Sequence, residues 1–441
     1  MTQQNSHPQA VVVGAGMAGL VAARALHRRG VDVVVLEAAS RPGGRVLAET
    51  TVLGSRVDLG GQWIGHGHHR FAALAAELGT TVYPMRTPKV PAILDGDTQV
   101  ATVGPTAVTA TAVLAVWEIA SRLGVPGSWK SQTVREWLER VPGRRTRRLL
   151  EVATAVATTA DLDRLSVHGM LEMVRFQGGL RGMLTTSGGA QDSLIVEGAG
   201  TLAERLAAEL GDRVVLDSPV TALRRDASGV TVESASGTYR AARVIVTVPP
   251  PTAARIEHHP ALPDTRIRLQ DNTYMGSVYK AIAVYDRPFW RERAEAELMT
   301  LTEPGIAFFD TSSPGGPGHL CVLIGGADAR SLDDLTPEDR RARILGTVTG
   351  RLGPEILTPR GWYEKSWHRD PHAGGGYTVL PEPGHTDGHF PLPAAPSGTV
   401  HWAGAETASE HAGYIEGAIE SGDRVAREVL AALATAEPAG R

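Results

Sequence analysis

The start of the chain alternates between apolar and amphipathic segments in the order of a βαβ unit. The apolar run AVVV (10–13) predicts a buried strand, and a glycine-rich turn leads from it into an amphipathic helix, LVAARALHRRG (20–30). The next segment, VDVVVLE (31–37), predicts a second strand. Because strand, helix and strand follow one another within one short stretch, the chain is predicted to begin with a parallel sheet.

Further along, helical and strand-like patterns follow one another without a regular repeat. Apolar residues at helical spacing predict helices over 71–79, 111–123, 201–210, 336–353 and 416–435. Alternating or continuous apolar runs predict strands within 213–248 and 278–324. Proline and glycine are spread evenly, so no linker divides the chain. The pattern predicts an α/β fold of mixed α+β character, with two domains built from alternating segments.

Composition narrows the classes of protein that the chain can represent. Its 441 residues exceed what one core usually organises, which favours two domains. With 42% apolar residues, 21% charged residues and a net charge of -4, the chain is globular and gives no indication of a nucleic-acid partner. The single cysteine, Cys321 in GHLCVLIGG, excludes an internal disulfide framework and is expected to be a buried strand residue in a reducing compartment.

The opening segment and the apolar runs give no indication of export or membrane insertion. MTQQNSHPQ has no basic segment, and glycines interrupt the apolar run after it, so no signal peptide is expected. The longest apolar runs fall short of the roughly 20 residues that span a bilayer. The sequence therefore predicts a soluble cytoplasmic protein without a membrane partner.

The turn after the first strand carries the glycine spacing of a dinucleotide site. Gly14, Gly16 and Gly19 stand in G-x-G-x-x-G order between strand and helix. The first glycine permits the tight turn, the second lets the backbone approach a pyrophosphate, and the third allows close packing of helix and strand. Glu37 ends the second strand, where a carboxylate can bind ribose hydroxyls. Together these features predict a dinucleotide cofactor.

The segment after Glu37 indicates which dinucleotide binds. AASRPGGRV (38–46) adds Gly43, Gly44 and Arg45, and this extension resembles the FAD-binding signature of two-domain flavoprotein oxidases. A simple NAD dehydrogenase has no reason to carry it. The sequence therefore favours FAD.

A second glycine motif offers an alternative cofactor site. Gly198-x-Gly200-x-x-Ala203, followed by Asp217 at the end of a predicted strand, could form an NAD(P)-binding unit. It contains only two glycines, and the helix that follows is short. An ordinary helix start in the first domain is the favoured interpretation.

Four further segments, in order and at compatible spacing, carry the motifs of one family. They are DLGGQWIG (58–65), GGAQ (188–191), MGSVYKAIAVYDRPFW (275–290) and HWAGAETASEHAGYIEGAIESGDRVAREVL (401–430). They resemble the flavin-dependent monoamine oxidase family, within the FAD amine oxidase and L-amino-acid oxidase superfamily, and the resemblance runs from about residue 10 to 432. It implies a Rossmann-like FAD-binding domain (1–82, 196–269 and 370–435) interleaved with a mixed-sheet substrate-binding domain (83–195 and 270–369).

The resemblance also implies an activity. Such an enzyme oxidises a primary or secondary amine to an imine by hydride transfer to flavin N5, and oxygen re-oxidises the flavin with release of hydrogen peroxide. The implied partners are a small amine and O2, and a homodimer is left open. Polyamines, arylalkylamines and intermediates of specialised metabolism all stay open as substrates, because the match is weakest over 83–195 and 270–370, where the cavity would be shaped.

Residue by residue, the resemblance implies the composition of the site. Tyr377 and Tyr414 match two tyrosines that form an aromatic cage for the amine in front of the flavin, and Lys280 matches a lysine that holds a water against flavin N5. Gln191 and Trp63 are expected to contact the substrate with the two tyrosines. The residues expected to bind FAD are Gly14, Ala15, Gly16, Met17, Ala18, Gly19, Glu37, Ala38, Arg41, Gly43, Gly44, Arg45, Gly60, Gly61, Gln62, Trp63, Val220, Trp367, Gly376, Tyr377, Gly404, Ala405, Glu406, Gly413, Tyr414 and Ile415.

Two expectations are negative. Gly376, in the run GGGY, stands where mammalian-type members of the family place the cysteine that bonds covalently to the flavin, so FAD is expected to bind non-covalently. The histidines His66, His68 and His69 lie close together, but no cysteine cluster or H-E-x-x-H pattern accompanies them. The family has no metal there, and none is expected here.

Three alternatives to an amine oxidase stay open at this point. An L-amino-acid oxidase would need an arginine for the substrate carboxylate, which DLGGQWIG does not supply but Arg86, Arg175 or Arg181 could. An NAD(P)H-dependent flavoprotein reductase would use the second glycine motif. A flavin-containing binding protein without turnover is disfavoured by the two matched tyrosines and by Lys280.

Overall fold

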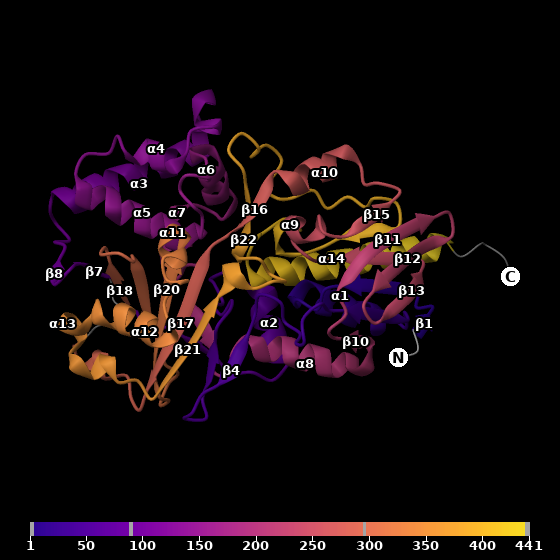
Figure 1. Ribbon diagram of the computed structural model, residues 1–441, viewed down its shortest axis with the longest axis horizontal. Coiled ribbons are helices and arrows are strands. Elements are labelled where there is room, and N and C mark those ends of the chain that lie inside the picture. The colour runs from indigo at the N-terminus through magenta and orange to yellow at the C-terminus, as the bar shows by residue number, and fades with distance from the viewer. Residues whose placement is uncertain (1–3, 88–90, 294–296, 437–441) are drawn as a thin grey trace.

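A computed structural model describes residues 4–87, 91–293 and 297–436. One layer is a five-stranded parallel sheet whose strands come from distant parts of the sequence, in the right half of Figure 1. The predicted βαβ unit is present in it as β2 (Ala10–Val13), α1 (Met17–His27) and β3 (Val33–Leu36). In spatial order the strands are β10 (Val214–Val215), β3 (Val33–Leu36), β2 (Ala10–Val13), β14 (Arg243–Val246) and β23 (Val400–Trp402).

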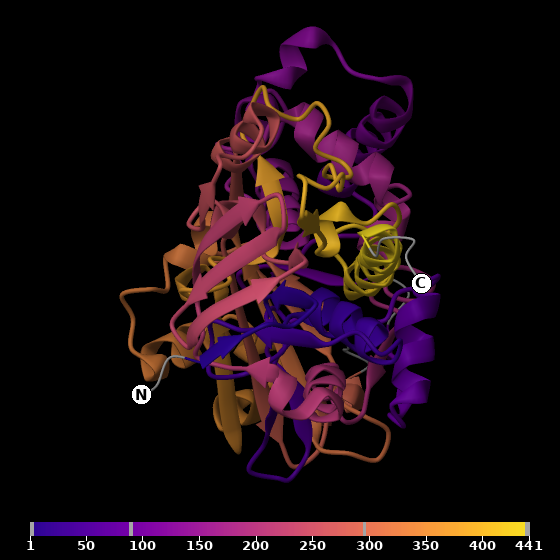
Figure 2. The same ribbon diagram turned by 90° about the vertical axis from the view of Figure 1, so that its right-hand side faces the viewer.

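Both faces of this sheet are covered, which explains the unbroken apolar run of β2. Val12 packs with the helices α1, α8 (Gly200–Leu210) and α14 (Ile415–Ala436), whereas Val11 and Val13 face a second sheet. Figure 2 shows that sheet on the side of the molecule away from α14. Its strands, in spatial order, are β1 (Gln4–Ser6), β13 (Gly237–Ala241), β12 (Gly229–Ser234), β11 (Val220–Asp226) and β15 (Glu257–His259).

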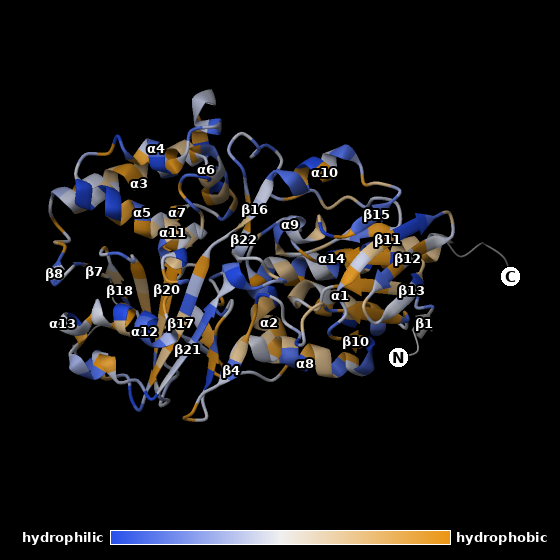
Figure 3. Ribbon diagram, in the orientation of Figure 1, coloured by the Kyte–Doolittle hydropathy of each residue, from blue (hydrophilic) through white to orange (hydrophobic). Residues whose placement is uncertain are grey.

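A seven-stranded mixed sheet forms the other half of the molecule. Its central strands β17 and β20 are buried along their whole length, and Figure 3 shows β20 largely in hydrophobic colours. Tyr279 and Ala281 face a core shared with α12 (Pro337–Gly346), whereas Lys280 and Ile282 point to the opposite face. The strand order is β21 (Gly361–Ser366), β17 (Val278–Tyr285), β20 (Gly318–Gly325), β19 (Ile306–Asp310), β18 (Glu297–Thr300), β7 (Ala92–Asp95) and β8 (Thr98–Gln99).

Helices pack on both sides of this sheet, and short strand pairs connect the two halves. The first helical group contains α3 (Pro105–Leu123), α4 (Val134–Leu138), α5 (Arg144–Thr158), α6 (Val167–Phe176) and α7 (Leu180–Leu184). The second contains α11 (Gly326–Arg330), α12 (Pro337–Gly346) and α13 (Thr349–Leu352). The strand pairs are β4 (Ala48–Thr50) with β5 (Arg56–Asp58), β6 (Val82–Pro84) with β9 (Ser193–Ile195), and β16 (Thr273–Gly276) with β22 (Gly376–Pro381). The remaining helices are α2 (His69–Glu77), α9 (Pro250–Ala253) and α10 (Asp264–Asp271).

The predicted fold class is confirmed, with two differences in the helices. The helix expected over 111–123 begins at Pro105, because proline is well suited to the first helical position. The helix expected over 336–353 is divided into α12 and α13. The domain boundaries stay a prediction. β16 and β22, which fall on opposite sides of one predicted boundary, pair with each other.

Within the described residues, α3 is the helix whose length and composition alone would allow a membrane crossing. It has 19 residues and a mean hydropathy of 1.2, and 22% of that stretch is buried. Ala110, Val113 and Trp117 pack into the helical group, while Val116 and Ile119 are exposed. A single helix of this kind is weak evidence for a membrane, and the absence of a membrane partner stays a prediction.

Buried neutral histidines predict that the fold loses stability in acid. Burial lowers the pKa of His389 to about 4, and His258 and His319 are lowered to about 4 in the same way. Between pH 4 and 6.5 the unfolded chain therefore binds more protons than the native one, so stability falls as the pH is lowered through this window. In the wild type, His389 should account for on the order of 3 kcal/mol of the fall in the free energy of unfolding in acid, and His389→Gln should remove that contribution. Urea unfolding of both proteins at pH 7 and pH 4.5 measures the difference. The same substitution at the exposed His7 should leave the pH dependence unchanged.

Candidate active site

A cavity of about 640 Å³ runs between the parallel sheet and the seven-stranded sheet. One part, here called the cofactor half, is lined by the glycine turn after β2, the end of β3 and the start of α14. The other part, here called the substrate half, is lined by β18, β19, α6 and the segment 183–191. Lys280, Tyr377 and Tyr414 all line this cavity.

The glycine turn has the backbone geometry of a pyrophosphate cradle. Gly14 has a φ of +103, and a Cβ on Gly19 would lie 2.0 Å from the carbonyl oxygen of Gly14, so both positions require glycine. Gly16 faces the cavity, with no atom within 4 Å of the place its Cβ would take. The N-terminus of α1 opens here, which favours an anion. This part of the cavity fits the diphosphate of a dinucleotide.

Glu37 lines the cavity beside this turn. Its Oε2 accepts the N–H of Ala15 at 2.6 Å, and its Oε1 accepts the N–H of Ala39 at 2.9 Å. Two backbone donors therefore orient a carboxylate at the end of β3, the position from which an acid can bind ribose hydroxyls.

A buried ion pair ties the loop after β3 to the C-terminal segment. Arg45 Nη1 lies 2.5 Å from Glu406 Oε1 and donates to the carbonyl oxygen of Tyr377 at 2.8 Å. Glu406 is only 5% exposed. Burial raises its pKa, but the Arg45 guanidinium and backbone N–H donors together lower it more, so the pKa of Glu406 lies below its usual value. One arginine thus joins three segments that line or support the cofactor half.

Lys280 projects from β17 to the boundary between the two halves. Its Nζ donates to the carbonyl oxygen of Gly60 at 2.8 Å and to Oε1 of Gln62 at 2.6 Å. It also lies 5.5 Å from the ring centroid of Trp63. Burial lowers the pKa of Lys280, while Cys321 and Asp58 raise it. The net effect lowers the pKa of Lys280, and the segment DLGGQWIG holds its Nζ in place as a buried hydrogen-bond donor.

Tyr377 and Tyr414 reach the cavity from separate segments. Burial raises the pKa of both hydroxyls, to about 12 for Tyr414, so both side chains are neutral phenols. The Tyr414 hydroxyl donates to Oε1 of Gln177 at 3.0 Å. The N–H of Tyr377 donates to Oγ1 of Thr159 at 3.1 Å, and that hydroxyl also contacts the carbonyl oxygen of Gly376. Both aromatic positions are fixed by polar contacts with the helical group.

The run GGGY packs against β16. A Cβ on Gly375, whose φ is +148, would lie 2.3 Å from the carbonyl oxygen of Gly276. Gly376 lines the cavity, and a Cβ there would meet Val278 Cγ1 at 3.0 Å. Glycine at 375 is thus required by close backbone approach. It brings Tyr377 to the cavity wall.

Most of the residues predicted from the sequence line this one cavity. Three of the predicted cofactor residues lie behind its wall: Ala15, Gly19 and Glu406. Gly19 acts in helix packing, and Glu406 acts by pairing with Arg45. Gln191 lines the substrate half, where its amide donates to the carbonyl oxygen of Met183 at 3.3 Å.

Sequence reasoning missed several residues of the substrate half and its support. Thr159 and Gln177 hold the two tyrosines, and Glu297, Phe309 and Met299 line the wall opposite the cofactor half. None of them belongs to a recognisable motif. The alternation of β18 and β19 predicts which residues share a face, but not that this face lines a cavity.

The three histidines do not form a metal site in the described part of the chain, which contains no group of three metal-ligating side chains. His68 is buried behind Tyr414, with ring centroids 5.1 Å apart, and accepts the N–H of Gly65 on Nδ1 at 2.8 Å. Burial lowers its pKa to about 3, and His411 and His69 add to this shift. His68 is therefore a neutral packing residue.

The second glycine motif does not form a nucleotide cradle. Asp58 accepts the N–H groups of Ala199 and Gly200 at 2.8 and 3.0 Å, so the start of α8 is already capped by a carboxylate. A Cβ on Gly200 would lie 2.4 Å from the backbone nitrogen of Ala48. The glycine serves close packing, as the favoured interpretation of the sequence expected.

The contact between Thr159 and the Tyr377 peptide leads to a prediction. Thr159→Val keeps the side-chain shape but leaves a buried N–H without its acceptor, so kcat for amine oxidation should fall roughly 3- to 10-fold while FAD stays bound. Thr159→Ser retains the hydroxyl and should stay close to the wild-type rate. Steady-state oxygen uptake and the flavin absorbance of both variants measure this, and equal rates in the two would contradict the positioning role.

Comparison with known proteins identifies the family to which this site belongs. The family model of flavin containing amine oxidoreductases matches residues 17–430. The chain belongs to this family. The amine oxidoreductase is 34% identical to AofH of Mycobacterium tuberculosis, and the match covers 96% of each of the two chains. AofH is named as a putative flavin-containing monoamine oxidase. It is 31% identical to human flavin-containing amine oxidase B, over 96% of its own chain and 86% of that protein.

A solved structure of an amine oxidase has the same fold as this chain. Cyclohexylamine oxidase from Brevibacterium oxydans superposes with a TM-score of 0.90 at 28% identity, covering 97% of this chain and 99% of that one. The amine oxidoreductase therefore uses FAD. The glycine cradle, Glu37 and the N-terminus of α1 would hold its ADP portion, and the cavity next to Lys280 and Tyr377 would hold its flavin ring.

Proposed function

We propose that this enzyme oxidises a primary or secondary amine that lacks an α-carboxylate, with non-covalently bound FAD and with O2 as its acceptor. The observation that carries the proposal is the pair Tyr377 and Tyr414, which are neutral, half-buried and line one cavity next to Lys280. Electron-rich aromatic faces suit an amine nitrogen, and fixed rings reduce the orientations open to it. When bound, FAD would supply the redox chemistry, by accepting the two electrons of the C–H bond next to the amine nitrogen and passing them to O2.

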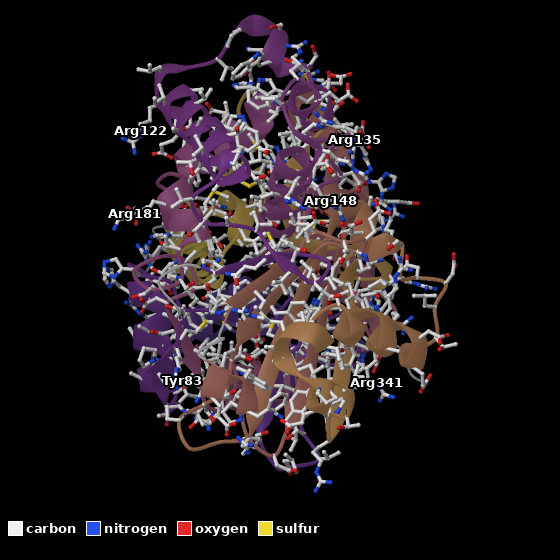
Figure 4. The ribbon with its side chains drawn as sticks, turned by 90° about the vertical axis from the view of Figure 1, so that its left-hand side faces the viewer. Tyr83, Arg122, Arg135, Arg148, Arg181 and Arg341 are labelled. Carbon is white, nitrogen blue, oxygen red and sulfur yellow. The ribbon has the colours of Figure 1, made fainter. Side chains whose placement is uncertain are left out.

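An amino-acid substrate is disfavoured by the charges on the cavity. Arg86, Arg175 and Arg181 are exposed and do not line it, and Figure 4 shows Arg181 pointing away from the molecule. Among the described residues, no arginine or lysine other than Lys280 borders the substrate half. A substrate carboxylate would therefore lack the cation that it needs when buried. The proposed substrate is an amine without that group.

The side chains around the substrate can carry out binding and orientation without an acid or base at the carbon. The substrate half is walled by apolar side chains such as Met173, Met299 and Phe309, which exclude water. The amine must arrive neutral to be oxidised, and burial beside neutral phenols favours the uncharged form. Lys280 keeps a donor at the boundary with the cofactor half, where it can orient a water or O2.

Non-covalent FAD is supported by Gly376, which has no side chain to form a bond, and by the burial of the only cysteine, Cys321, in β20. Acid precipitation should leave the yellow colour in the supernatant, and a yellow pellet would contradict this. The buried free thiol also supports the proposal of a cytoplasmic location.

The test of the function is a peroxide-release screen over alkylamines, arylalkylamines, diamines and L-amino acids. Activity on amines and none on amino acids is the expected result, and the reverse order would overturn the proposal. Tyr377→Ala or Tyr414→Ala should lower kcat/KM roughly 10- to 100-fold with FAD still bound. Tyr363→Ala is the matched control, because this tyrosine is on β21, the strand next to β17, and does not line the cavity. Wild-type turnover in both cage variants would remove the cage from the mechanism.

A further inference from the structure

Glu297 places a buried carboxylate on the wall of the substrate half. It is the first residue of β18, it is 5% exposed, and it lines the cavity. Its Oε1 accepts the hydroxyl of Thr186 at 2.6 Å, and Thr186 lines the cavity as well. Burial raises the pKa of Glu297, and the Thr186 hydroxyl is the only group that opposes this shift. Within the described residues, no cation stands beside this acid.

Other buried acids of the fold have the partners that Glu297 lacks. Glu406 pairs with Arg45, and Asp310, on the neighbouring strand β19, lies 2.5 Å from Arg291 Nε. Asp58 caps the start of α8 by accepting hydrogen bonds from two backbone N–H groups. These acids have structural roles. Burying a carboxylate without such partners costs free energy, so Glu297 is not explained by the stability of the fold.

The strand register gives the place of Glu297 relative to the redox centre. Glu297 is opposite Phe309 on β19, Phe309 is opposite Cys321 on β20, and Cys321 is opposite Ile282 on β17. Ile282 lies on the same face as Lys280, two residues further along β17. Three strand spacings of about 4.8 Å separate β17 from β18, or about 14 Å between backbones. Glu297 therefore stands at the end of the substrate half that is remote from Lys280.

Aromatic and apolar side chains line the path between these two ends. Trp63, which contacts the Lys280 ammonium, packs edge-on against Phe309 with ring centroids 5.4 Å apart. Met299, two residues along β18 on the same face, adds apolar surface next to Glu297. Such a wall suits a methylene chain with a polar group at each end, the reacting amine near the tyrosines and a second group at Glu297.

We propose that Glu297 binds a second, positively charged nitrogen of the substrate, so that the enzyme prefers diaminoalkanes or longer polyamines over monoamines of the same length. A cation at this position would pair with the carboxylate and complete its hydrogen bonding, which Thr186 alone does not do among the described residues. The same charge repels a carboxylate, in agreement with the exclusion of amino acids. This inference rests on the proposed function and names its substrate class.

The experiment compares substrates that differ only in the remote charge. Diaminobutane, diaminohexane and diaminooctane are tested against butylamine, hexylamine and octylamine, with FAD-loaded wild type and Glu297→Gln. The wild type should favour at least one diamine over its matched monoamine. Glu297→Gln should lower kcat/KM for that diamine roughly 10- to 100-fold, mostly through KM, and change the monoamine less than about 3-fold. Glu292→Gln, an exposed acid five residues earlier, should change neither.

Each outcome of this comparison decides the inference. Equal losses on diamine and monoamine would assign Glu297 a structural role, and unchanged diamine kinetics would remove the subsite. A wild type that oxidises monoamines but discriminates against every diamine would also overturn it, while leaving the proposed function intact. If the wild type oxidises no amine, the proposed function falls. The subsite is then judged by thermal shift, in which protection by a diamine that Glu297→Gln abolishes supports it and no protection overturns it.

Discussion

Replacement of Lys280 by methionine is expected to slow the re-oxidation of reduced FAD by oxygen about 100-fold or more, and to slow reduction by the amine far less. The Lys280 ammonium is buried at the boundary of the two cavity halves, held by the carbonyl oxygen of Gly60 and by Gln62. Reduction of oxygen develops negative charge, which a fixed cation in a dry site stabilises strongly. Oxidation of a neutral amine develops no such charge next to Lys280. Stopped-flow absorbance of the flavin in the two half-reactions measures both rates.

A lysine on the neighbouring strand provides the control. Lys365 of β21 is opposite Lys280 in the strand register, but its Nζ lies 2.7 Å from Asp370, in a salt bridge. Lys365→Met removes the same charge from the same sheet and should leave oxygen reactivity within about 3-fold of the wild type, because the lost ion pair is partly exposed. If Lys280→Met slowed both half-reactions equally, the role of Lys280 would be structural rather than electrostatic.

The cofactor half could be predicted from the sequence because its determinants are local. The turn with Gly14, Gly16 and Gly19 needs glycine for backbone reasons that act within one βαβ unit, and Glu37 follows from the length of that unit. Tyr377, Tyr414 and Lys280 could be placed only through the family resemblance, because each lies in a segment that reaches the cavity by tertiary packing. The structure brings all three to one cavity.

The substrate half could not be predicted because its residues carry no local signal. Glu297 resembles any charged residue at the start of an edge-like strand, and only the pairing of β18 with β19 and β7 buries it. Thr159 acts through a hydrogen bond to a peptide more than 200 residues away. Such contacts depend on the packing of the helical group against the seven-stranded sheet. Local pattern does not determine them.

Loss of the Arg45 side chain is expected to give the largest stability change among the substitutions considered. Arg45→Met leaves Glu406 as an uncompensated charge at 5% exposure and leaves the carbonyl oxygen of Tyr377 without its donor. Breaking a buried ion pair by removing one partner costs about 3–5 kcal/mol. The variant should also bind FAD more weakly, because Arg45 lines the cofactor half. Urea unfolding at saturating FAD and an FAD titration measure the two effects.

A double substitution separates the cost of the stranded charge from the loss of packing. Arg45→Met combined with Glu406→Gln removes both charges, so the double variant should be more stable than Arg45→Met alone, although each single change destabilises the wild type. The exposed pair Arg287 and Glu292 serves as the comparison, and Arg287→Met there should cost less than about 1 kcal/mol. If Arg45→Met were no more costly than Arg287→Met, the Arg45–Glu406 pair would not hold the cofactor segments together. If the double variant regains stability relative to Arg45→Met, the cost of the single substitution comes from leaving the Glu406 charge buried without its partner.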